Sequence, residues 1–247
     1  MKRLVPLIAL AVVVAGCGGG GGGGSATVFA ATSLTDVFPQ IDSTARFNFA
    51  GSGDLAFQIE QGARADVYAP ASTKYSDELY SKELVERPRV FATNRLVLIV
   101  PKSNPEHITS LGGLMKPGVK LVLAEPGVAA GDYARIVLDR YCKTIFIPTG
   151  AHCPRAKVVS EEPDVKDVVA KIALDEADAG FVYVTDAKAA AGKVRAISVP
   201  ARLQPPIEYA IAVVKDAKHS NEAKQFVELV LGPKGRAALR SAGFGLP

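Results

Sequence analysis

The sequence predicts an α/β protein, and two observations predict it. Short runs rich in Val, Ile, Leu and Phe alternate with longer segments whose apolar residues recur every three to four positions. This alternation begins near residue 26 and continues almost to the end of the chain. It is typical of proteins with largely parallel sheets. No repeat of the length found in solenoids is visible.

The expected elements follow the chain in order. Strands are expected at Thr27–Ala31, Arg46–Ala50, Asp66–Ala69, Arg95–Pro101, Lys120–Ala124, Lys157–Ser160, Ala179–Val184 and Ile207–Val214. Helices are expected at Leu55–Gln61, Tyr133–Tyr141, Val165–Asp175, Asn221–Leu231 and Pro233–Ser241. The last strand comes late and two helices follow it. This order permits either a linear pair of domains or a two-lobe clamp in which the chain crosses over and returns.

The N-terminus predicts export and a lipid anchor. Lys2 and Arg3 precede an apolar run at 4–15, which is too short to span a bilayer as a mature helix. The run ends in Val-Ala-Gly-Cys, which resembles the lipobox of bacterial lipoproteins, with Cys17 as the acylated residue. Residues 1–16 would then be a signal peptide. Residues 17–25 would be a lipidated cysteine with a glycine-rich tether that holds the protein on the extracytoplasmic face of the membrane.

The charge and cysteine content narrow the function classes. The 247-residue chain carries a formal net charge of +4, and removal of residues 1–16 takes away two basic and no acidic residues, which leaves +2. Without a basic run, nucleic acid is not expected as a partner. Cys142 and Cys153 are an even pair in an exported chain, which favours a stabilising disulfide that closes a short loop.

One arrangement recurs at five places: a strand or short loop runs into small or polar residues, and a helix begins there. The five junctions are at 28–34, 47–54, 125–133, 160–165 and 181–186. The first turn of a helix has free backbone N–H groups and a partly positive end, so it can receive an anion without Lys or Arg. Each junction alone is equally an ordinary helix cap. A binding site would require several of them to converge, and convergence is not visible in sequence.

The junction residues carry a family resemblance. The motifs are VFAATSL at 28–34, FAGSGDLAFQIEQGARADVYA at 49–69, AEPGVAAGDYA at 124–134, DVKDVV at 164–169, AGFVYVTDA at 179–187 and the closing SAGFGLP. In this order the chain resembles the periplasmic molybdate-binding proteins of ABC importers, the ModA family, from about Thr27 to Phe244. The resemblance implies a non-enzymatic solute-binding protein without a cofactor.

The resemblance also implies a ligand and its donors. A tetrahedral dianion, molybdate and also tungstate, would be held by neutral hydrogen-bond donors. Carried over motif by motif, these are the hydroxyls and amides of Ser33 and Ser52, the backbone amides of Ala130 and Val165, and the phenol of Tyr183. An unperturbed tyrosine is protonated near neutral pH, so its O–H can be given to an oxyanion.

The implied fold is the type II periplasmic-binding-protein fold, with two α/β lobes, a hinge and a ligand cleft between the lobes. Lobe I would take 26–91 plus 203–247 and lobe II 92–202, with crossovers near 92–94 and 200–202. Ligand contacts from both lobes would stabilise a closed form. The membrane permease subunits of an ABC importer would recognise that form, and the binding protein itself is expected to be a monomer.

Other binding functions remain open. Sulfate and phosphate are also tetrahedral, and a partly protonated phosphate benefits from an acceptor such as Asp54. We expect Asp54 and Asp132 to be helix-cap acids that face away from the ligand. A ferric-iron site would use Tyr133 and Tyr183, but Gly and Ala surround them.

An enzyme is the alternative from another class. His107, His152 and His219 are scattered, no serine lies in a nucleophile elbow, and no HExxH motif occurs. The sequence therefore favours binding over catalysis.

Overall fold

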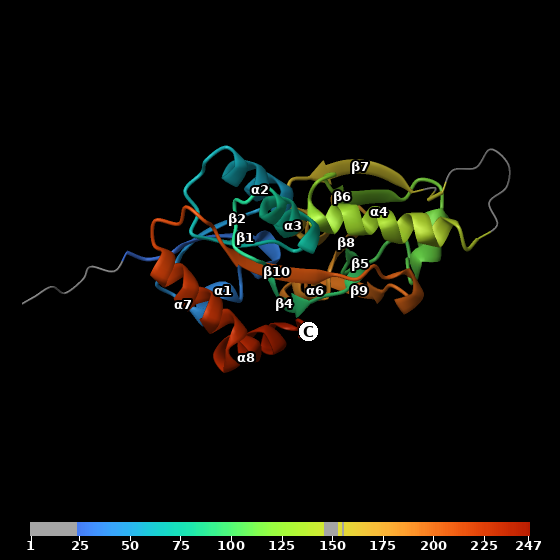
Figure 1. Cartoon of the computed structure of the whole chain (residues 1–247). Helices are drawn as coiled ribbons and strands as arrows, with labels where there is room; N and C mark the ends of the chain where they lie inside the picture. Colours follow the sequence, from blue (N-terminus) through green and yellow to red (C-terminus); the bar gives the residue numbers. More distant parts are fainter. Residues whose placement is uncertain (1–23, 146–152, 155) are drawn as a thin grey trace, which may run out of the picture.

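The protein has two α/β lobes, each built on a five-stranded sheet (Figure 1). The computed structural model describes residues 24–145, 153–154 and 156–247. The predicted signal peptide and the predicted lipidation site Cys17 lie outside this range. Within the described residues no helix is both long and apolar enough to cross a membrane.

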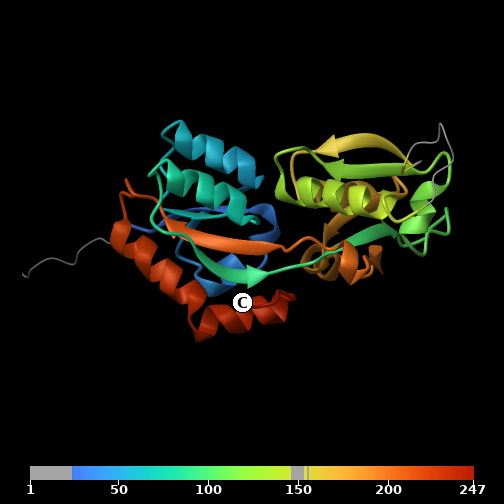
Figure 2. The same cartoon turned by 45° about the vertical axis from the view of Figure 1, so that its right-hand side comes forward.

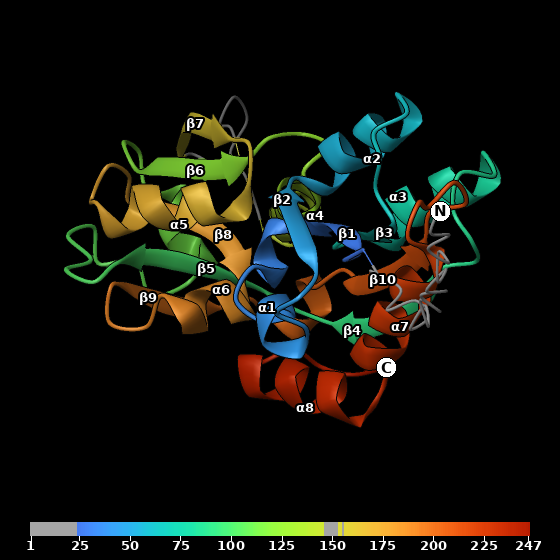
Figure 3. The same ribbon diagram turned by 90° about the vertical axis from the view of Figure 1, so that its left-hand side faces the viewer.

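The first lobe contains the sheet with strand order β2-β1-β3-β10-β4. Its strands are β1 Thr27–Ala31, β2 Arg46–Ala50, β3 Val67–Ala69, β4 Arg89–Thr93 and β10 Glu208–Val213. Its helices are η1 Thr32–Leu34, α1 Phe38–Ile41, α2 Ser52–Glu60, α3 Thr73–Ser81, α7 Ser220–Leu231 and α8 Pro233–Ala242. Figures 2 and 3 show α2 and α3 on one side of this sheet and α7 and α8 on the other. Buried aromatic rings such as Phe38 and Phe226 fill the space under α7.

The second lobe contains the sheet with strand order β7-β6-β8-β5-β9. Its strands are β5 Leu96–Pro101, β6 Lys120–Ala124, β7 Lys157–Glu162, β8 Ala179–Tyr183 and β9 Val194–Ser198. Its helices are η2 Leu111–Met115, α4 Ala129–Cys142, α5 Val165–Ala173, α6 Val184–Ala189 and η3 Ala201–Leu203. Both α4 and α5 pack on the central strands β6, β8 and β5. These strands are apolar on both faces because both faces are covered.

The expectation of largely parallel sheets is wrong. In each sheet two strand pairs are parallel and two are antiparallel. All four antiparallel pairs involve β5 or β10, and each of these is the first strand after one of the two places where the chain crosses between the lobes. The spacing of apolar residues in the sequence cannot reveal the direction of a strand, because a buried strand has the same composition in either direction.

The chain crosses between the lobes twice, and the two crossings lie side by side (Figure 2). The β4–β5 crossing passes through Asn94, whose amide donates to the carbonyl of Ile207 in the β9–β10 crossing at 3.0 Å. The Gln204 side chain exchanges two hydrogen bonds with the backbone of Leu96. The first sheet holds residues up to Thr93 and the second begins at Leu96, so the lobes divide at 94–95. The chain therefore forms a clamp and not a linear pair of domains.

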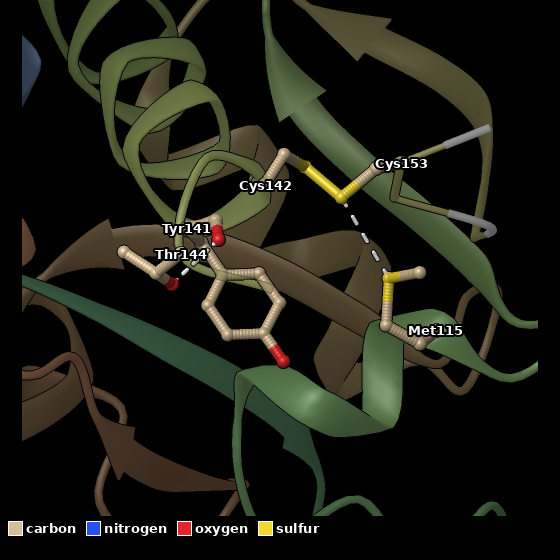
Figure 4. Close-up of a disulfide and its surroundings, with 5 residues drawn as sticks. All are labelled: Met115, Tyr141, Cys142, Thr144 and Cys153. Atoms are coloured by element: carbon tan, nitrogen blue, oxygen red, sulfur yellow. Dashed lines mark hydrogen bonds between the residues drawn. A yellow bond between two sulfur atoms is a disulfide. The ribbon is translucent and has the colours of Figure 1, made fainter. Parts of the chain in front are cut away.

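A disulfide joins Cys142, the last residue of α4, to Cys153, with Cα atoms 5.8 Å apart (Figure 4). The Met115 sulfur lies 3.7 Å from Cys153 Sγ. The bond therefore ties the end of α4 to the chain that leads into β7, at the end of the lobe remote from the first lobe.

Candidate functional site

The five donors predicted from the sequence line one pocket. Ser33 and Ser52 come from the first lobe, and Ala130, Val165 and Tyr183 come from the second. The pocket is small, about 20 Å³, and it lies where η1, α2, α4 and α5 begin. Four helix starts that are far apart in sequence therefore converge on one cavity between the lobes.

Ser33 lies in η1, directly after β1, and its hydroxyl is oriented by a chain of buried groups. Its Oγ is 2.9 Å from the Tyr209 hydroxyl, and Asn94 donates to that same hydroxyl at 3.4 Å. Either hydroxyl can be the donor in the Ser33–Tyr209 bond, and when Tyr209 donates, its proton goes to Ser33 Oγ. The proton of Ser33 is then free to be donated into the pocket. Tyr209 and Asn94 were not predicted as site residues, since neither lies in a helix-start motif.

Ser52 is the first residue of α2, and Gly51 before it takes the N-cap position. The Ser52 hydroxyl oxygen accepts the backbone N–H of Ala71 at 3.0 Å, so its own proton is also available to the pocket. The buried Tyr68 hydroxyl donates to the Ser52 carbonyl at 2.7 Å and fixes the start of the helix. Gly51 lies so close to the second lobe that a β-carbon there would come within 3.2 Å of the Pro163 carbonyl.

The second lobe contributes two helix N-termini. Ala130 is the second residue of α4, and Val165 is the first residue of α5. The Asp164 side chain caps α5 by accepting the amides of Lys166 and Asp167 at 2.7 and 3.1 Å. This cap leaves the Val165 amide for the pocket. Both residues are buried and have apolar side chains, so they can offer only their backbone amides to a ligand.

Two buried hydroxyls of the pocket have no hydrogen-bond partner in the described part of the chain. They are the phenol of Tyr183 and Oγ1 of Thr32. Burial, and then the adjacent Tyr209, raises the pKa of Tyr183 well above its usual value, so the phenol keeps its proton. A buried hydroxyl without a partner is costly, and both of these lie against the same cavity. Thr32 was missed from sequence, although it directly precedes a predicted donor.

The pocket is electrostatically unusual for an anion site, because none of the described residues that line it is basic. Asp54 is exposed and does not line the pocket, as expected. Asp132 faces away from it and binds the Gly127 amide and the Tyr75 hydroxyl. Asp164 lines the pocket, and its Oδ1 accepts both amides of the α5 cap. Positive potential therefore comes from helix starts and from O–H and N–H dipoles.

The residues of the alternative functions lie elsewhere. His107 is exposed, and His219 bonds to Asp66 through Nδ1 at 3.1 Å, while His152 lies outside the described residues. Tyr133 does not line the pocket, which removes one of the two tyrosines that a ferric site would need. No group of three His, Cys, Asp or Glu side chains within the described ranges could hold a metal ion.

Residues 26–245 match the family described as bacterial extracellular solute-binding protein. The chain is 38% identical over 233 residues to the molybdate-binding protein ModA of Mycobacterium tuberculosis, which covers 90% of this chain and 85% of the relative. Among solved structures, the periplasmic molybdate-binding protein of Azotobacter vinelandii has a TM-score of 0.74 at 22% identity and covers 90% of this chain and 100% of its own.

The sulfate-binding protein SubI of Mycobacterium tuberculosis has a TM-score of 0.72 at 16% identity and covers 89% of this chain and 86% of its own. At these identities the two structural matches support the fold alone, and they confirm the two-lobe periplasmic-binding-protein architecture. The family match and the curated relative go further: the chain is a non-enzymatic solute-binding protein of ABC transport and belongs to the ModA family of molybdate-binding proteins.

Proposed function

We propose that this protein captures molybdate, and also tungstate, in the pocket between its lobes and delivers it to the membrane subunits of an ABC importer. The proposed donors are the hydroxyls and amides of Ser33 and Ser52, the amides of Ala130 and Val165, and the phenol of Tyr183. We add the hydroxyl of Thr32 to this set.

The observation that supports the proposal most strongly is the pair of unpartnered hydroxyls on Thr32 and Tyr183, which face one cavity with four helix starts around it. A tetrahedral dianion has acceptor oxygens in four directions and no proton to donate. A set of neutral donors that converge on one cavity therefore matches it.

Two other oxyanions are the alternatives. Phosphate carries a proton part of the time near neutral pH and benefits from an acceptor; Asp164 lines the pocket and uses only its Oδ1 for the two cap bonds, so phosphate must be tested directly. Sulfate matches these donors as well as molybdate does, and the same fold occurs in a protein named for sulfate binding. Size is then the discriminating property, and it must be measured.

The test is a thermal titration of the soluble domain with molybdate, tungstate, sulfate and phosphate. A ligand at one hundred times its dissociation constant stabilises a protein by about 2.7 kcal/mol, which a melting scan detects easily. We expect molybdate and tungstate to raise Tm and the other two anions to raise it much less. No shift with molybdate, or a larger shift with sulfate or phosphate, would refute the assignment.

We also propose that Cys17 carries a lipid and that the glycine run after it links the anchor to the first lobe. The support is the sequence Val-Ala-Gly-Cys after an apolar run, followed by seven consecutive glycines. In cells, Cys17→Ala should move the protein out of the membrane fraction or leave it unprocessed. The purified domain should bind the anion unchanged, and loss of affinity would contradict the tether.

A further inference from the structure

Tyr75 lies on α3 of the first lobe, and its hydroxyl reaches across to the second lobe. It is 2.5 Å from the carbonyl oxygen of Gly127 and 2.9 Å from Oδ2 of Asp132. The ring is 6% exposed. Burial, and then the hydrogen bond and charge of Asp132, raises the pKa of Tyr75, so the phenol keeps its proton and is the donor. The one phenol proton is shared between these two acceptors, and the carboxylate gives the interaction a charge-assisted component.

The acceptor side is a preformed turn. Gly127 has a φ of +93°, which glycine adopts without strain, and its amide donates to Oδ1 of Asp132 at 3.1 Å. Asp132 thus accepts the Gly127 amide with Oδ1 and the Tyr75 hydroxyl with Oδ2. The first lobe fits closely here, because a β-carbon on Gly53 would lie 2.6 Å from the Gly127 carbonyl.

The Tyr75 contact lies beside groups of both lobes that form the pocket. Asp132 stands two residues after Ala130 in the first turn of α4, whose free amides face the pocket. On the other side, α3 begins just after Ala71, whose amide holds the Ser52 hydroxyl. Separation of the lobes would break the Tyr75 contacts and pull the α4 amides away from Ser52 together.

Near the crossings, buried side chains also join the lobes, such as Tyr183 against Tyr209 and Asn94 bonded to Thr185; away from the crossings, the other polar bridges are more exposed. The Lys166–Asp36 ion pair measures 2.7 Å, with side chains 35% and 56% exposed. Exposed ion pairs of this kind are screened and contribute little. Lys188 donates to the Ser241 carbonyl at 2.6 Å, also at the surface. The Tyr75 bonds are part-buried and involve a charge, so among the polar contacts away from the crossings they are the strongest candidate for holding the lobes together.

We propose that the Tyr75 hydroxyl is a positioning group that clasps the first lobe to the 127–132 turn of the second and slows the release of the bound anion. The inference rests on the proposed function for the identity of the anion, but the clasp itself does not depend on it. An anion enclosed between the lobes leaves only after they open, and opening breaks this bond.

The test compares Tyr75→Phe with wild type by stopped-flow release of molybdate into excess chelating protein or competing tungstate. We expect release to become about tenfold faster or more, the scale of one lost hydrogen bond to a charged group, with little change in the association rate. In parallel, the distance between spin labels on the two lobes, measured without ligand, should shift toward the open form. Tyr80→Phe, on the same helix with its side chain largely in solvent, is the matched control and should leave both readouts unchanged.

Asp132→Asn supplies a second variant that keeps the fold. An asparagine has one acceptor oxygen for two donors, so either the turn or the Tyr75 bond is lost. Release should again be faster, and Tyr75→Phe should then add less than it does alone. Wild-type release rates in Tyr75→Phe, or strictly additive effects of the two changes, would overturn the proposal. If the wild-type protein does not bind molybdate, the proposed function is refuted. The distances between the spin labels still test whether Tyr75 holds the lobes together.

Discussion

Removal of the Tyr183 hydroxyl should have opposite effects on ligand binding and on folding. Tyr183→Phe deletes one oxygen and keeps the ring, which packs edge-on against Tyr209 with ring centres 5.8 Å apart. The side chain is 1% exposed and its hydroxyl has no partner among the described residues. The substitution therefore breaks no hydrogen bond of the ligand-free protein.

The two magnitudes follow from that environment. A buried polar group without a partner costs about 1–3 kcal/mol, so the ligand-free variant should be as stable as wild type or more stable by up to this amount. A hydrogen bond to a charged group contributes about 1.5–3 kcal/mol, so the molybdate Kd should rise roughly tenfold to one-hundred-fold. Most single substitutions lower stability, so unchanged or higher stability with weaker binding is a distinctive result.

Isothermal titration with molybdate gives Kd, and urea unfolding without ligand gives the free energy of unfolding. Unchanged affinity would show that the phenol is not a donor to the anion. A ligand-free variant less stable by more than about 1 kcal/mol would show that the hydroxyl has a partner in the folded protein, and the reasoning would fail at that step.

Two further predictions concern groups around the same pocket. Ser52→Ala should weaken molybdate binding by about 1.5–3 kcal/mol, measured by the same titration, and wild-type affinity would place the anion away from the start of α2. Asp186 is buried beside Tyr183, whose amide it accepts at 3.1 Å, and burial raises its pKa to about 7. A raised carboxyl pKa favours folding fully below about pH 4, and this contribution is lost as pH rises through about 7. Asp186→Asn removes the charge and keeps an acceptor oxygen. The free energy of unfolding of the variant should therefore exceed that of wild type at pH 8 by up to about 4 kcal/mol, with a higher Tm, and the gap should close at pH 4. A pH-independent difference between the two melting curves would refute this interpretation.

Helix starts could be located from sequence because their signal is local. The motifs around Ser33 and Ser52 combine an apolar run with small residues and then a helical pattern, and these parts follow one another directly in the chain. Strands with exposed residues on one face were harder to predict from the sequence. β4 at Arg89–Thr93 and β9 at Val194–Ser198 are edge strands with exposed residues, so neither has a continuous apolar run. α3 was missed because only three of its nine residues are buried.

The supporting residues of the site could not be predicted, because their importance depends on long-range contacts. Tyr209 meets Ser33 across 176 positions, and Tyr75 meets Asp132 across 57. Each of the two tyrosines lies within an ordinary element, a strand and a helix, where a buried aromatic ring is expected for packing alone. Their hydroxyls acquire a role only after the two crossings at Asn94 and Ile207 bring the lobes together. The sequence pattern thus identifies surfaces that can bind an anion, and the topology determines what orients them.

The closed form without an anion is subject to two opposed contributions. Closure buries the hydroxyls of Thr32 and Tyr183 without partners, which costs about 1–3 kcal/mol each, and it forms the Tyr75 bond, which returns about 1.5–3 kcal/mol. The two hydroxyls together cost about 2–6 kcal/mol, at least as much as the Tyr75 bond returns, so a ligand that satisfies both hydroxyls shifts the balance strongly toward closure. Tyr183→Phe and Tyr75→Phe should therefore move the ligand-free lobes in opposite directions, the first toward the closed form and the second toward the open form. Label distances that move the same way in both variants would show that the buried hydroxyls do not oppose closure.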